Sequence, residues 1–168
     1  GTFYYPFKSM DDLIDRVIED EILGNGSVMQ NVFGLIAGSS AVDSFETLVN
    51  RKAGKFALLI NQGGMDLFSA KIKRLVFATW EAILCNDGEE LTPSTRLIIE
   101  YSTSGIIGII TYGAQHGTGN VPPEFFLSFV KDNSEFLVGQ IGIAQGIPRD
   151  AVLDRISATL RVSSMNNR

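Results

Sequence analysis

The amino-acid sequence predicts an all-α fold, and three observations lead to that prediction. Apolar residues recur at three- and four-residue intervals in almost every segment, which is the period of an amphipathic helix. No segment shows the two-residue alternation bounded by hairpin turns that is typical of β-strands. Helix-capping residues, prolines and glycines divide the chain into pieces of helical length. We therefore expect a bundle of about six to seven helices.

The first predicted helix begins after Ser9. A serine there can accept a hydrogen bond from an early backbone amide, and Asp11 and Asp12 favour the positive end of the helix dipole. Glycines at positions 24 and 26 loosen or end this helix. Its apolar face is formed by Leu13, Ile14, Val17, Ile18 and Ile22.

Shorter helical pieces follow over residues 28–36, 42–49 and 56–60, separated by glycine-containing breaks. The strongest periodic segment comes next and is closed by the turn residues at 86–88. Its apolar stripe consists of Phe68, Ile72, Leu75, Val76, Trp80, Ile83 and Leu84.

Two long helices are predicted towards the C-terminus. Thr92 as N-cap and Pro93 at the first helical position begin a helix that extends to about Gln115. Its apolar residues surround the axis, so this helix must be covered on several sides. A second long helix covers residues 123–143, and a final short helix around Val152, Ile156 and Leu160 precedes a polar tail.

Composition restricts the possible functions. The 168 residues carry a formal net charge of −5, which disfavours a nucleic-acid surface made by these residues alone. The single cysteine and the lack of Cys-His ligand spacing predict no disulfide, metal site or other cofactor. The longest charge-free stretch, residues 101–123, is too polar to span a membrane, and the first residues do not resemble a signal peptide. We expect a cytoplasmic protein with no membrane partner.

Candidate catalytic residues all have a simpler structural interpretation. His116 lies at a glycine-rich helix end and is interpreted as a helix-terminal residue, because no nucleophile or orienting carboxylate can be assigned to it. Cys85 is interpreted as a small buried hydrophobe, with a redox-sensor thiol as the alternative. The Glu89-Glu90 pair is interpreted as a solvated loop. The prediction is that this protein is not an enzyme.

One segment carries a family resemblance. Thr2-Phe3-Tyr4-Tyr5-Pro6-Phe7-Lys8-Ser9-Met10-Asp11-Asp12-Leu13 resembles the signature of TetR-family transcriptional regulators at the end of the helix-turn-helix recognition helix. The order of the following helices is also similar to the family's regulatory domain. Two positions depart from the pattern, because Pro6 stands at the usual histidine and Met10 at a frequent lysine.

The resemblance implies a domain organisation. Residues 1–8 would be the remnant of the recognition helix, residues 9–162 the effector-binding and dimerisation domain, and residues 163–168 a polar tail. By the family's layout, roughly forty residues that complete the helix-turn-helix would come before this chain. The residues that would touch DNA phosphates in the intact protein are Thr2, Tyr4, Tyr5 and Lys8.

The same resemblance implies a pocket for an unidentified, largely apolar effector inside the regulatory helices. Aromatic residues with apolar bodies and polar tips suit such a pocket, although a purely structural core is the alternative. The predicted pocket residues are Phe56, Phe77, Trp80, Tyr101 and Tyr112.

A homodimer is also expected, because the apolar residues of the two long helices spread over more than one face of each. In TetR-like proteins a two-fold pairing of these helices gives a four-helix interface. The predicted interface residues are Ile106, Ile107, Ile110, Phe125, Phe126, Phe129, Phe136 and Leu137.

The functional hypothesis is thus a TetR-family transcriptional regulator, a repressor, in which this chain senses the effector and dimerises. Operator DNA would be a partner of the intact protein only. The rival hypothesis is a helical protein-interaction or small-molecule-carrier module without a DNA role.

Overall fold

The computed structural model describes residues 8–23, 32–34, 36, 63–86, 88–117 and 120–165. Over these residues it contains helices and no strand, which confirms the predicted all-α class. The elements are α1 (Met10–Val17), a π-helix η1 (Ile18–Leu23), α4 (Met65–Leu84), α5 (Pro93–His116), α6 (Pro123–Gln145) and α7 (Arg149–Met165). The predicted pieces at 42–49 and 56–60 lie outside the described residues.

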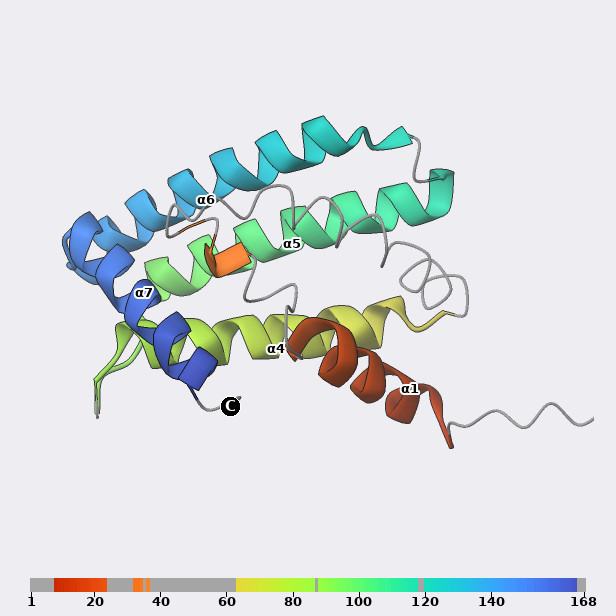
Figure 1. The fold of residues 1–168 in the computed structure, drawn as a ribbon, viewed down its shortest axis with the longest axis horizontal. Coiled ribbons are helices and arrows are strands. Elements are labelled where there is room, and N and C mark those ends of the chain that lie inside the picture. The colour runs from red at the N-terminus through yellow and green to blue at the C-terminus, as the bar shows by residue number, and fades with distance from the viewer. Residues whose placement is uncertain are drawn as a thin grey trace, which may run out of the picture.

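Three long helices form the body of the fold. Figure 1 shows α4, α5 and α6 running back and forth in antiparallel directions, with α7 crossing near the C-terminal ends of α4 and α6. The first helix, α1, lies against the N-terminal half of α4 (Figure 1). In this arrangement α5 and α6 form a helical hairpin in which α5 lies between α6 and α4 (Figure 1).

The helix starts follow the local chemistry expected from the sequence. The Ser9 hydroxyl accepts from the backbone amide of Asp12 at 3.1 Å, and the Asp12 carboxylate accepts from the amide of Lys8. Thr92 caps α5 by accepting from the Thr95 amide at 3.2 Å. The Ser9 and Thr92 hydroxyls thus each satisfy a helix-terminal donor that would otherwise have no partner inside the helix.

The turn between α6 and α7 depends on a glycine. Gly146 adopts the left-handed conformation, with φ 71° and ψ 26°, and the amide of Ile147 donates to the carbonyl of Gly142 at 2.9 Å. A residue with a side chain is strained in that conformation, so glycine ends α6 at low cost. The final helix then extends for 17 residues and is longer than expected.

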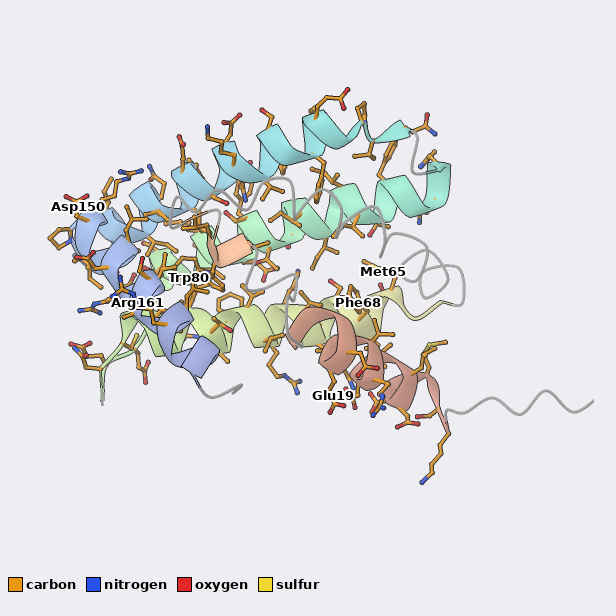
Figure 2. All side chains as sticks on the ribbon, viewed as in Figure 1. Glu19, Met65, Phe68, Trp80, Asp150 and Arg161 are labelled. Carbon is orange, nitrogen blue, oxygen red and sulfur yellow. The ribbon has the colours of Figure 1, made fainter. Side chains whose placement is uncertain are left out.

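The largest apolar cluster lies where α4, α5, α6 and α7 meet. Trp80 is 2% exposed there, and its ring makes an edge-on contact with Phe33 at a centroid distance of 5.5 Å. Figure 2 shows Trp80 between the helices and beside α7. The other members of this cluster from the long helices are Ile83, Leu84, Ile99, Leu137, Val138, Ile141, Val152 and Ile156.

A smaller cluster joins α1 to α4. It consists of Ile14 and Ile18 packed on Phe68, with half-buried apolar residues around them. Phe68 lies near the N-terminal end of α4 (Figure 2). The Lys71 ammonium adds ion pairs with Asp11, at 2.8 Å, and with Asp15. These carboxylates stabilise the charged ammonium and raise the pKa of Lys71.

Candidate functional site

The α5–α6 hairpin carries several large exposed apolar side chains. On α5 these residues follow helical spacing, since Leu97 and Tyr101 are four apart and Tyr112 lies three turns further along. Tyr101 is 70% exposed, which is unusual for a residue in an apolar segment. We call this surface the outer apolar face; it consists of Leu97, Tyr101, Tyr112, Phe125, Phe136 and Ile143.

Residues of the two helices meet at two places on this surface. The rings of Tyr101 on α5 and Phe136 on α6 meet edge-on at a centroid distance of 6.3 Å. Near the opposite end of the hairpin, Tyr112 and Phe125 line the same hollow. The Phe125 ring also stacks on that of Phe129 at 6.2 Å. Tyr101 and Phe136 therefore meet at one end of the helix pair, and Tyr112 and Phe125 border one hollow at the other.

The hollow between Tyr112 and Phe125 has a volume of about 370 Å³. Gly105 and Gly108 lie at its α5 side, and a Cβ atom added at either glycine would meet no other group within 4 Å. Ile109, Asn120 and Val121 complete the lining. The small residues thus leave room on the outer apolar face that an inserted side chain or small molecule could fill.

Charged groups on α5 are directed away from this surface. Glu100 accepts a hydrogen bond from Ser104 at 3.2 Å and forms an ion pair with Lys73 of α4. The Lys73 ammonium holds the pKa of Glu100 below its ordinary value, because it favours the charged carboxylate. Glu100 therefore helps to dock α5 on α4 and adds no charge to the outer apolar face.

The predicted interface residues divide into three groups. Phe125 and Phe136 are exposed and belong to the outer apolar face. Half-buried positions are occupied by Ile106, Ile110 and Phe129. The remaining three, Ile107, Phe126 and Leu137, are buried within the chain's own packing.

The predicted pocket residues that the structure describes fall into two groups. Trp80 lies in the large apolar cluster, and the half-buried Phe77 packs against that cluster. Tyr101 and Tyr112 lie instead on the outer apolar face. Phe56 lies outside the described residues.

Among the predicted phosphate-contacting residues, Thr2, Tyr4 and Tyr5 lie outside the described part of the chain. Lys8 is described and exposed, and its backbone amide takes part in the cap of α1. Its side chain is accessible next to the start of this helix.

His116 is the last residue of α5, as expected from its position. Its ring stacks on Tyr112 at 4.2 Å, and its Nδ1 atom lies 3.1 Å from the Tyr112 carbonyl oxygen. Within the described residues no group of three or more His, Cys, Asp or Glu side chains could hold a metal ion.

The half-buried thiol of Cys85 is not activated. Burial raises the pKa of Cys85, and the carboxylates of Glu81 and Glu89 raise it further. A reactive thiol needs a depressed pKa, so these surroundings disfavour the redox-sensor alternative.

One buried polar residue is not among those that the sequence singles out. Ser102 is 3% exposed on α5, and its Oγ atom has no hydrogen-bond partner. The sequence held no signal for it, because periodicity does not determine which side of a helix is buried when apolar residues surround its axis.

Comparisons with known proteins add no relative: no family model, no curated protein and no solved structure matches this chain. A search of the described helices for one long and apolar enough to cross a membrane also finds none.

Proposed function

We propose that this chain is the effector-sensing and dimerisation domain of a TetR-family transcriptional regulator that acts as a repressor. The proposal combines the resemblance of residues 2–13 with the outer apolar face, which is the observation that carries it. Soluble monomers rarely expose large contiguous apolar patches, and such patches mark interaction surfaces. A second copy of the chain is the partner we assign to this one.

Self-association is supported by the composition of the outer apolar face. A two-fold interface brings the same patch of both subunits together, so the patch must carry both projecting and recessed parts. Phe125 and Phe136 project from α6, while Gly105 and Gly108 border the hollow on α5. Two such hairpins would form a four-helix interface with aromatic side chains near its centre.

Signal transmission is assigned to α1, which follows directly after the segment that resembles a recognition helix. Its contact with α4 is small and has a charged rim at Lys71. A largely apolar effector bound among the helices would favour one placement of the two α1 helices, and thereby of the DNA-binding heads. Such regulation requires different effector affinities in the DNA-competent and released states.

Light scattering of the purified chain tests the dimer. At micromolar concentration we expect a mass near twice the 18.3 kDa of one chain. Phe136→Glu should give a folded monomer, because it replaces an exposed aromatic ring of the outer apolar face with a second charge next to Asp132, one turn earlier on α6. Ala158→Glu, at an exposed position of α7, is the matched control and should remain dimeric.

A wild-type monomer, or a Phe136→Glu variant that stays dimeric, would contradict this interface. A monomer would favour the rival interaction-module hypothesis, in which the outer apolar face binds a different protein. Circular dichroism of each variant separates loss of association from loss of folding.

A further inference from the structure

Two oppositely charged residues lie on α6 between the exposed phenylalanines of the outer apolar face. Asp132 is seven residues after Phe125 and four before Phe136, so the three side chains lie on one stripe of the helix. Lys131 precedes Asp132 at the edge of this stripe, and both residues are exposed. We call Lys131 and Asp132 the charged pair.

The charged pair has little to do inside the chain. In the described part of the structure, neither Lys131 nor Asp132 forms an ion pair. Ser128 donates to the Asp132 carboxylate at 3.5 Å, which is at the limit of a hydrogen bond. A carboxylate that becomes covered by an apolar interface is costly unless a cation lies close to it. Any molecule that covers this face must therefore bring a cation to Asp132.

The aromatic residues of the outer apolar face form two groups, one on either side of the charged pair. Tyr101 meets Phe136 at one end, and Tyr112 borders the hollow with Phe125 at the other. On each helix the two aromatic residues are eleven positions apart, which is about 16 Å along a helix. Because the spacing is the same on α5 and α6, turning the hairpin end over end places each group where the other was.

The direction of the two-fold axis distinguishes two limiting arrangements of a dimer through this face. If the axis runs along the helices, α6 lies on the partner's α5, and Asp132 lies over Gly105, which is level with it on the antiparallel helix. The α5 side chains with a full charge at pH 7, Arg96 and Glu100, are already paired with α4. That helix therefore offers Asp132 no cation.

If the axis runs across the helices, α6 lies antiparallel on the partner's α6. We infer that the chain dimerises in this way, with the two-fold axis beside the charged pair, so that Lys131 of each copy binds Asp132 of the other. Phe136 of one copy then lies over Phe125 of the other and enters the hollow of about 370 Å³, which the second copy completes. The inference rests on the dimerisation proposed above and adds the register of the interface.

Two charge-reversal variants test this register. Lys131→Asp places two acidic residues beside the axis in each copy, and Asp132→Lys places two basic residues there. Each variant alone should dimerise at least about tenfold more weakly than the wild type, because like charges face each other. An equal mixture should form mainly the heterodimer, because both ion pairs are restored between the two variants. Sedimentation velocity and native mass spectrometry measure these populations.

The double variant Lys131→Asp/Asp132→Lys exchanges the two charges within one chain. It should dimerise like the wild type, because each copy again meets the opposite charge of its partner. Matched controls come from Arg149 and Asp150, a neighbouring basic and acidic residue exposed at the start of α7. Arg149→Asp and Asp150→Lys should each dimerise like the wild type, and their mixture should show no preference for the heterodimer. Circular dichroism checks the folding of every variant.

Two results would overturn this register: single variants that dimerise as tightly as the wild type, or a mixture without preference for the heterodimer. A double variant that stays as weak as the single ones would also overturn it. Failure of the proposed function looks different, because the wild type itself would then be a monomer. A dimeric wild type whose charge variants show no selective pairing would retain the interface and reject only the antiparallel contact between the two α6 helices.

Discussion

The α5–α6 hairpin and the contact between α1 and α4 are held together in different ways. Two apolar clusters lie along the hairpin, and Gln145 of α6 accepts hydrogen bonds from both Thr92 and Thr95 at the start of α5. The contact between α1 and α4 consists of one small apolar cluster and the ion pairs of Lys71 at its exposed edge. The hairpin therefore suits a rigid interface, whereas α1 can be displaced with less loss of packing.

Two fully buried isoleucines test this difference directly. Ile99 in the hairpin and Ile14 in α1 are both 0% exposed. Ile99→Ala should lower the global free energy of unfolding by about 2–5 kcal/mol, because it leaves a cavity in the main cluster. Ile14→Ala should instead free α1 locally and lower the global stability less.

Urea unfolding and amide hydrogen exchange separate these outcomes. We expect exchange in Ile14→Ala to accelerate in α1 while protection in α5 and α6 is retained. Equal losses of global stability in the two variants would show that α1 unfolds together with the hairpin, and the comparison would then fail.

A substitution next to the turn after α6 is expected to have the next largest effect on stability. A Cβ atom at Gly142 would lie 2.8 Å from the backbone carbonyl oxygen of Ile147, which has little freedom to move. Gly142→Ala should destabilise the protein by about 1–3 kcal/mol, as overpacking does elsewhere. At Gly139, on the same helix, an added Cβ atom would meet no other group within 4 Å, so Gly139→Ala should stabilise by up to about 1 kcal/mol.

Thermal melts of the two alanine variants check this pair. A Gly142→Ala protein as stable as Gly139→Ala would mean that the end of α6 adjusts freely. The hairpin would then be less rigid than its capping interactions indicate.

The sequence predicted where helices begin, but it did not predict which side of each helix is buried. Ser9, Thr92 and Pro93 predicted the starts of α1 and α5 because caps depend on neighbouring residues. Tyr101 was expected in an effector pocket, yet it lies on the outer apolar face. Periodicity does not determine which side of a helix is buried when apolar residues surround its axis.

The state of Ser102 was beyond sequence reasoning for a related reason. Whether a serine bonds to its own helix depends on its rotamer and on the packing around it. Ser134 makes that bond and Ser102 does not, although both are buried on long helices.

The ion pairs of Lys71 provide a smaller test of the α1 contact. Lys71→Met removes the ammonium that binds Asp11 and Asp15. We expect faster hydrogen exchange in α1 and little change in the global unfolding midpoint. Arg74→Met, at an exposed position of the same helix, is the control and should leave α1 protection unchanged. Loss of protection in α5 with Lys71→Met would contradict a local role.

The smallest expected effect is the pH dependence of the link between α4 and α5. The Lys73 ammonium lowers the pKa of Glu100 from its ordinary value of 4.5, so the folded state favours the ionised carboxylate. This stabilisation is present above pH 4.5 and is lost as the pH falls through the lowered pKa of the folded state. At pH 7 the free energy of unfolding of the wild type should exceed that of Glu100→Gln by only about 0.5 kcal/mol, because both partners are partly exposed and the interaction is screened by solvent.

Urea unfolding of both proteins from about pH 7 to about pH 3 should show the two stabilities converging below pH 4.5. A difference that persists at the acid end of this range would mean that Glu100 acts through packing and not through its charge, and the ion pair would contribute nothing to docking α5 on α4.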